Sequence, residues 1–184
     1  RPVRREPRLH VTIATAIPKG DRQRFLVEKL TELGCSKLVP LTTARSSVTL
    51  HRKSVDKLMR YVIDACKQCG RNLLMEIETP CGLSDFLESD AGNEASEETG
   101  HLKLVAHPYA IAEVADSSPL SWADLPIDGN TKSVTIIIGP EGGLSDKEVR
   151  NAIEHGYRPL LLGNRILRIE TAAVASMSLL MADE

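Results

Sequence analysis

Residues 138–145 have the sequence IGPEGGLS, and residues 161–172 have the sequence LLGNRILRIETA. Each stretch begins at the end of an apolar run and finishes where a helix is predicted to start. A glycine turn after a strand brings backbone amides close to a ligand, because glycine has no Cβ in the way. In open α/β sheets, ligands bind outside the carboxyl ends of the strands. The two stretches therefore predict one pocket built from both.

Apolar runs and helical patterns alternate along the rest of the chain. The runs that predict β-strands are residues 11–17, 38–41, 75–78, 102–106, 134–138 and 160–162. Helices are predicted from an N-cap at Asp21 to Gly34, over residues 54–69, from Ser145 to Gly156, and over about 170–182. This alternation is typical of an α/β domain with a mostly parallel sheet and helices on both faces.

Three of these segments carry the clearest patterns. Residues 134–138 are apolar at positions that point to both faces, as expected for a central parallel strand. Ser145 and Glu148 have the spacing of a capping box. The last helix is apolar almost all round, so it must be covered on several sides. Because a terminal helix has few neighbours in its own chain, this favours a subunit interface.

Composition excludes several classes of protein. The chain has 184 residues, of which 42% are hydrophobic and 26% charged, as in an ordinary globular domain. Aromatic residues make up 3%, so base stacking is not expected to be the main binding device. No apolar run approaches the roughly 18 residues of a membrane helix, which predicts no membrane association. Residues 66–69 have the CxxC spacing without a second pair, so no metal site is predicted.

Charge is distributed unevenly. Residues 1–80 contain sixteen Lys and Arg against eight Asp and Glu, a balance of +8 that leaves −10 for the remainder. A basic N-terminal half suits a polyanionic partner, although an unpartnered solvated surface is an equal alternative on charge alone. Residues 88–100 contain five acidic residues and nothing apolar larger than alanine, which predicts a flexible surface insertion.

The motifs together resemble the RsmE family, which belongs to the SPOUT class of methyltransferases. The resemblance begins with the two glycine stretches and continues upstream, in the same order, through residues 18–22, 32–34, 45–46 and 66–71. It implies methylation of N3 of a uridine in small-subunit ribosomal RNA, with S-adenosylmethionine (SAM) as the methyl donor. It also implies a C-terminal trefoil knot that holds SAM through backbone groups, and a homodimer.

The resemblance divides the chain at about residue 10. Residues 10–184 are expected to form the SPOUT methyltransferase domain, and residues 1–9 a basic linker. The family usually carries an N-terminal PUA-like domain that binds RNA, which is expected to be absent here. The expected compartment is the cytoplasm, or the plastid or mitochondrial matrix in a eukaryotic source.

Candidate site residues follow from these motifs. The residues expected to bind the cofactor are His107, Ile138, Gly139, Pro140, Glu141, Gly142, Gly143, Leu162, Gly163, Arg165, Ile166, Leu167 and Thr171. Uridine N3 is a poor nucleophile while protonated, so a site must remove its proton or stabilise the anion that spreads onto the carbonyl oxygens. We assign Arg168 to face the uracil and Glu170 to orient it or accept the proton. Lys19, Arg22, Arg45 and Arg71 are expected to contact RNA phosphates.

Two other functions remain open from the residues alone. Gly139 to Gly143 could form the anion loop of a nucleotide-binding or phosphate-binding α/β enzyme. That alternative is weaker, because the loop lacks the Gly-Lys-Ser/Thr ending of a P-loop and no GxGxxG is present. The other alternative is a non-catalytic RNA-binding protein that retains a methyltransferase fold.

Overall fold

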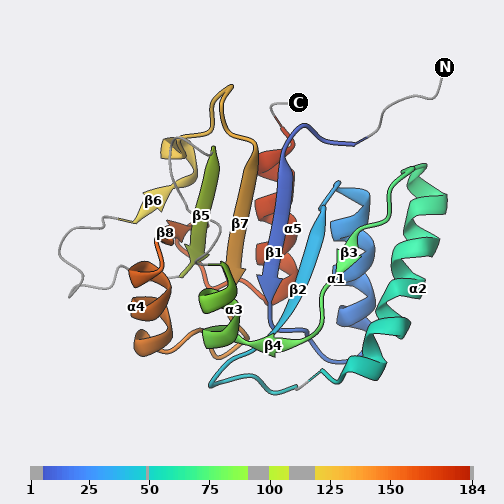
Figure 1. Ribbon diagram of the computed structural model, residues 1–184, viewed down its shortest axis with the longest axis horizontal. Helices are drawn as coiled ribbons and strands as arrows, with labels where there is room; N and C mark the ends of the chain where they lie inside the picture. The colour runs from blue at the N-terminus through green and yellow to red at the C-terminus, as the bar shows by residue number, and fades with distance from the viewer. Residues whose placement is uncertain (1–5, 49, 91–99, 108–118, 183–184) are drawn as a thin grey trace.

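The computed structural model describes residues 6–48, 50–90, 100–107 and 119–182, and its strands form one sheet (Figure 1). The strands are β1 (His10–Thr15), β2 (Lys37–Thr42), β3 (Glu76–Ile77), β4 (Cys81–Gly82), β5 (His101–Ala106), β6 (Leu120–Ser121), β7 (Ser133–Ile138) and β8 (Arg158–Leu161). Their order is β3-β2-β1-β7-β5-β8-β6, with β4 paired to β2, and every described pairing is parallel. The predicted parallel α/β sheet is confirmed.

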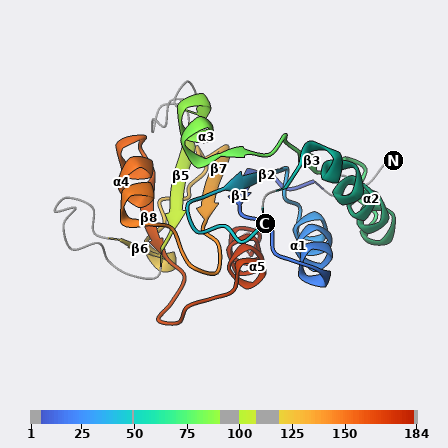
Figure 2. The ribbon, with the colours of Figure 1, turned by 90° about the horizontal axis from the view of Figure 1, so that it is seen from below.

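Helices cover both faces of this sheet, as predicted (Figure 2). They are α1 (Asp21–Glu32), α2 (Arg52–Cys69), α3 (Leu83–Asp90), α4 (Asp146–Glu154), α5 (Ile169–Leu180) and the short 3-10 helix η1 (Trp122–Asp124). Helices α1, α2 and α5 lie on one side, and α3 and α4 lie on the other. No helix in the described part of the chain is long and apolar enough to cross a membrane.

The central strand β7 contributes to the core on both faces. Val134, Ile136 and Ile138 pack on the side of α1 and α5, whereas Ile137 packs on the side of α3 and α4. Side chains alternate along a strand, so a strand buried on both faces needs apolar residues on both; the buried Thr135 is an exception, and its hydroxyl is hydrogen-bonded to His101. This burial fixes the position of β7, and with it the place where the chain leaves the sheet at Gly139.

Two helix ends, the start of α4 and the end of α2, have the predicted capping residues, and the start of α1 does not. The Ser145 hydroxyl accepts from the Glu148 amide and the Glu148 carboxylate accepts from the Ser145 amide, which completes the predicted capping box of α4. Gly70 ends α2 in the left-handed conformation, with φ 77°. The predicted N-cap at Asp21 is wrong, because Asp21 is the first helical residue and Gly20, with φ 63°, holds the cap position.

The predicted flexible acidic insertion at 88–100 is wrong at its start. Glu88 and Asp90 belong to α3, and Asp90 is buried against Lys103 of β5. A carboxylate can be buried there because a lysine ammonium pairs with it, which residue composition alone does not reveal. Residues 91–99 lie outside the described part of the chain.

The predicted linker at residues 1–9 is only partly described. Leu9 is buried in the core, and the Glu6 carboxylate lies 2.7 Å from Nη2 of Arg71. Residues 6–9 therefore pack against the domain, while residues 1–5 lie outside the described residues.

Candidate active site

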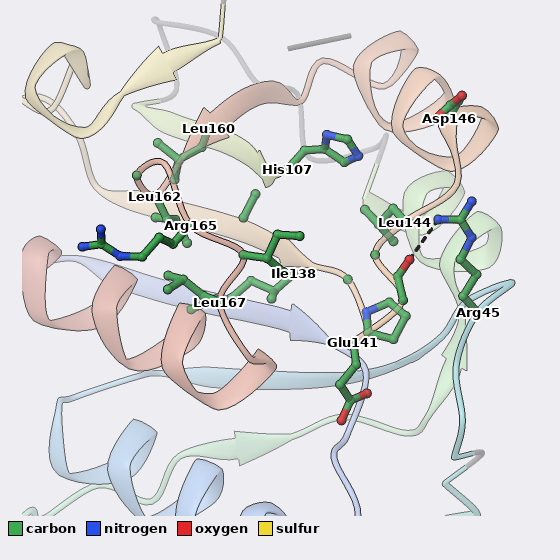
Figure 3. A pocket seen from close by; sticks show the side chains of 18 residues that line it. Arg45, His107, Ile138, Glu141, Leu144, Asp146, Leu160, Leu162, Arg165 and Leu167 are labelled. Carbon is green, nitrogen blue, oxygen red and sulfur yellow. Dashed lines mark hydrogen bonds between the residues drawn. The ribbon is translucent and has the colours of Figure 1, made fainter. Parts of the chain in front are cut away.

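A cavity of about 230 Å³ opens at the carboxyl ends of β7, β5 and β8 (Figure 3). These three strands are neighbours and parallel, so the segments that follow them emerge side by side. The cavity is lined by Arg45, Ala106, His107, Ile138, Gly139, Pro140, Glu141, Gly142, Gly143, Leu144, Asp146, Leu160, Leu162, Gly163, Arg165, Ile166, Leu167 and Ala172. The two glycine stretches therefore meet in one pocket, as the sequence predicts.

All the residues predicted to bind a cofactor line this cavity except Thr171. Thr171 lies in the first turn of α5, where its side chain is exposed to solvent. Sequence reasoning missed Ala106, Leu144, Leu160 and Ala172, each of which is adjacent in sequence to a predicted residue or stretch, or lies within one. It also missed Asp146, which follows the capping serine.

The walls of the cavity are apolar, and its corners are bare backbone. Ile138 of β7, and Leu162 and Leu167 of the connection between β8 and α5, project into the hollow (Figure 3). A Cβ at Gly139 would lie 2.9 Å from both Cγ and the amide nitrogen of Leu144, closer than real Cβ contacts allow. Gly163 has φ 117°, a conformation that favours glycine strongly. Such a site suits a ligand with a flat apolar part that also forms hydrogen bonds to main-chain groups.

The loop after β2 is hydrogen-bonded to the turn at residues 139–143, which we call the first glycine corner. Nη1 of Arg45 donates to the carbonyl oxygen of Gly142 at 2.9 Å, and the Ala44 amide donates to Oε1 of Glu148 at 2.8 Å. Burial raises the pKa of the Glu148 carboxyl, but hydrogen bonds from Ala44 and Ser145 outweigh burial, so its pKa lies below the ordinary value of 4.5. Arg45, predicted to contact RNA, therefore also forms part of the cavity wall.

The two predicted catalytic residues lie beside the cavity rather than in its wall. Arg168 is exposed at the N-cap of α5. Glu170, two residues later, is 6% exposed, and its Oε2 has no hydrogen-bond partner among the described residues. Nη1 of Arg22 lies 3.9 Å from Oε1 of Glu170 and 3.0 Å from Oε1 of Glu141. The described residues contain no group of three or more His, Cys, Asp or Glu able to hold a metal ion.

The predicted phosphate ligands occupy different environments. Lys19 is exposed just after β1, with no ion pair to any described residue. The side chain of Arg71 is 6% exposed, donates to the carbonyl oxygens of Thr31 and Cys35, and pairs with Glu6. Its guanidinium therefore lacks the free donors that a phosphate contact requires, and the prediction for Arg71 is corrected to a structural anchor.

The profile of the RNA methyltransferase domain family matches residues 4–181. The chain belongs to this RNA methyltransferase domain family. A Synechocystis relative named ribosomal RNA small subunit methyltransferase E is 31% identical over 170 residues, covering 92% of this chain and 52% of the relative. The RsmE resemblance is thereby confirmed.

Two solved structures share this methyltransferase fold. A Legionella pneumophila protein solved with bound SAM is 39% identical, with TM-score 0.81 over 98% of this chain and 69% of that chain. Ribosomal RNA small subunit methyltransferase E from Neisseria gonorrhoeae, also bound to SAM, is 28% identical, with TM-score 0.76 over 95% of this chain and 66% of that chain. The methyltransferase domain thus spans about half of the Synechocystis relative and about two thirds of the two solved chains.

Proposed function

We propose that this domain transfers a methyl group from SAM to N3 of a uridine in small-subunit ribosomal RNA. The observation that carries the proposal is the cavity where residues 138–145 and 161–172 meet at the carboxyl ends of β7 and β8. Relatives that match nearly all of this chain carry the corresponding name, and one of them was solved with SAM.

The cavity residues fit SAM. A Cβ at Gly139 would clash with Leu144, so glycine is needed for the tight turn that brings the main chain of residues 139–143 to the cavity. Ile138, Leu162 and Leu167 would enclose the adenine, and the backbone around Gly163 would hold the remaining polar groups. When bound, SAM supplies an electrophilic methyl group on a sulfonium.

Arg168 and Glu170 are our candidates for handling the uracil. Oε2 of Glu170 is buried without a hydrogen-bond partner, so a role as acceptor for the uracil N3 proton requires RNA binding to expose it. Arg168, exposed at the start of the same helix, is free to stabilise negative charge on a uracil carbonyl oxygen. Arg168→Ala should lower turnover about 100-fold while leaving SAM affinity unchanged. Unchanged turnover would remove Arg168 from the mechanism.

Lys19 and Arg45 are the proposed phosphate contacts. Lys19 is fully available, and Arg45 uses one nitrogen for Gly142 while the rest of its exposed side chain can face the RNA. Each contact releases counterions from the RNA, so removing either side chain should reduce the salt dependence of RNA binding by about one phosphate. RNA affinity that is insensitive to salt would contradict this role.

A homodimer and a C-terminal trefoil knot complete the proposal. After β8 the chain returns across the strand ends to α5, which packs against α1 on the opposite side of the sheet from α4 (Figure 2). This return path supports the proposed knot. Leu179 of α5 and Ile166 before it are 40% and 68% exposed, which supports burial against a second copy. Leu179→Glu should shift sedimentation from dimer to monomer, whereas Leu73→Glu, in the exposed loop after α2, should not.

Methyl transfer to ribosomal RNA is the deciding experiment. The assay supplies labelled SAM with small subunits or free RNA that lack the modification, and maps the methylated base. Transfer to a uridine N3 is the expected result. Calorimetric titration with SAM, ATP and NAD separates this proposal from a nucleotide-binding enzyme, and SAM binding without transfer to either RNA form would favour a non-catalytic RNA-binding protein. A ribosomal substrate would be met in the cytoplasm, or in the plastid or mitochondrial matrix if the source is eukaryotic.

A further inference from the structure

Arg22 connects three segments that are far apart in the sequence. It is the second residue of α1, and its side chain is 38% exposed. Its Nη1 lies 3.0 Å from Oε1 of Glu141, in the first glycine corner, and 3.9 Å from Oε1 of Glu170, in the first turn of α5. One guanidinium group therefore lies between a residue of the cavity wall and a buried carboxylate.

The charges around Arg22 explain why this position needs a cation. Glu170 is 6% exposed, and burying a carboxylate without a compensating charge is strongly unfavourable. Glu141 approaches the same nitrogen, so without Arg22 the two carboxylates would repel each other. Figure 3 shows the Glu141 side chain pointing away from the hollow, so its carboxylate is directed at the scaffold rather than at a ligand.

The first glycine corner is thus held from two sides. Arg22 binds the Glu141 side chain, and Arg45 donates to the Gly142 carbonyl oxygen at 2.9 Å. Glycines make this segment intrinsically flexible, because a chain without Cβ atoms has many accessible conformations. Two arginine contacts at adjacent residues restrict that freedom before any ligand arrives.

We propose that Arg22 is a positioning residue that holds the 139–143 corner in its ligand-binding shape and neutralises Glu170. The part of this proposal that concerns SAM rests on the proposed function, because SAM is the ligand assigned to the corner. Arg22 was predicted from the sequence to contact an RNA phosphate. Its Nη1 instead faces two carboxylates of its own chain, which would weaken an additional phosphate contact.

The test compares Arg22→Ala with Arg24→Ala. Arg24 lies two residues along the same helix, where it is 60% exposed and pairs only with Glu28 among the described carboxylates. Because the 139–143 corner would then have to be ordered on binding, Arg22→Ala should weaken SAM binding by about tenfold or more. Arg24→Ala should leave SAM affinity unchanged. Neither substitution should change the salt dependence of RNA binding.

Two further variants separate positioning from general destabilisation. Arg22→Lys keeps the charge and should recover part of the SAM affinity that Arg22→Ala loses. Glu141→Gln, at an exposed position, should weaken SAM binding without lowering thermal stability and provides the test if Arg22→Ala does not fold. The double variant Arg22→Ala/Glu141→Gln should lose less affinity than the two single losses combined, because both remove the same contact.

Amide hydrogen exchange of the protein without ligand tests the positioning role separately from the proposed function, because it does not depend on SAM binding. The amides of residues 141–144 should exchange faster in Arg22→Ala than in the wild type, and not in Arg24→Ala. Faster exchange in a protein that does not bind SAM would overturn the proposed function and leave the positioning role intact. The positioning role would be overturned if Arg22→Ala changed neither the exchange of these amides nor the affinity for SAM. In that case Arg22→Ala should instead lower the salt dependence of RNA binding by the amount expected for one lost phosphate contact.

Discussion

The phenolic oxygen of Tyr157 lies 2.7 Å from Oδ2 of Asp90, although 67 residues separate them in the sequence. Nζ of Lys103 lies 2.9 Å from the same carboxylate oxygen and donates to the Asp90 carbonyl oxygen at 2.8 Å. Burial, together with the hydrogen bond to Asp90, raises the pKa of Tyr157 above its ordinary value, so its hydroxyl remains a donor. This buried network joins the end of α3 to β5 and to the start of β8. It lies on the face of the sheet that α3 and α4 cover.

Breaking this network should destabilise the domain in a defined order. Asp90→Ala leaves the Lys103 ammonium buried without a counter-charge, although its hydrogen bond to the carbonyl oxygen of residue 90 can remain, so the free energy of unfolding should fall by about 3 kcal/mol. Tyr157→Phe removes one hydrogen bond while Asp90 keeps Lys103, so its loss should be about 1 kcal/mol. Urea unfolding of each variant measures these differences. Glu88→Gln, at an exposed position of the same helix, serves as the control and should change stability little. An Asp90→Ala loss no larger than that of Glu88→Gln would contradict the network.

The parts of the fold that sequence analysis predicted are those with a long periodic pattern. The strand at 134–138 and the helix at 54–69 were both recovered, because a strand buried on two faces and a long amphipathic helix leave clear signals. Strands β4 and β6 have two residues each and carry no period. Helix α3 was missed, because its apolar stripe spans only eight residues and runs into an acidic segment.

The candidate site also has a part that the sequence predicts and a part that it does not. The pocket could be predicted, because parallel strands place their carboxyl ends at one edge and the glycines mark the turns there. The partners of the arginines could not. A sequence gives the charge of Arg22 and Arg71 but not the carboxylates that tertiary packing brings to them, namely Glu141 and Glu6. Charge alone therefore overestimated the surface available to RNA.

Glu148 should make stability sensitive to acid. Its pKa is lowered in the folded state, so the contribution of its contacts is complete above the ordinary value of 4.5 and is lost as the pH falls through the lowered pKa. The stability difference between the wild type and Glu148→Gln should be constant above about pH 5 and shrink as the pH falls below 4.5. Urea unfolding from pH 3 to pH 7 measures it. A difference that grows on acidification would mean that the carboxylate is destabilised in the fold.

Cys35 should be chemically inert until the domain unfolds. Burial raises the pKa of its thiol to about 12, against an ordinary value of 9.0. Only the thiolate reacts, so the reactive fraction at pH 8 should be about a thousandfold lower than in the unfolded chain. Alkylation followed by mass spectrometry should modify the partly exposed Cys69 before Cys35. Equal rates for these two cysteines in the native protein would show that the α1–β2 junction opens readily.

The glycine corner offers the sharpest test of the pocket, because three glycines differ in known ways. A Cβ at Gly139 would meet Leu144 at 2.9 Å. A Cβ at Gly143 would meet nothing within 4 Å, but the backbone there has a φ of 71°, which strains any other residue. Gly129, which lies outside the corner, has open space around it and no positive φ. Gly139→Ala should therefore displace the corner and lower stability by about 1–3 kcal/mol, while Gly143→Ala should cost about 1–2 kcal/mol of backbone strain. Gly129→Ala should be nearly neutral.

Ligand binding should rank these variants in the same order, because the first two glycines line the cavity and Gly129 does not. Calorimetry with SAM should give the weakest binding for Gly139→Ala, an intermediate loss for Gly143→Ala and wild-type affinity for Gly129→Ala. If Gly139→Ala folds and binds SAM as well as Gly129→Ala does, the ligand does not depend on close approach to the first corner. The cofactor would then have to be held elsewhere, and the assignment of this cavity would fail with it.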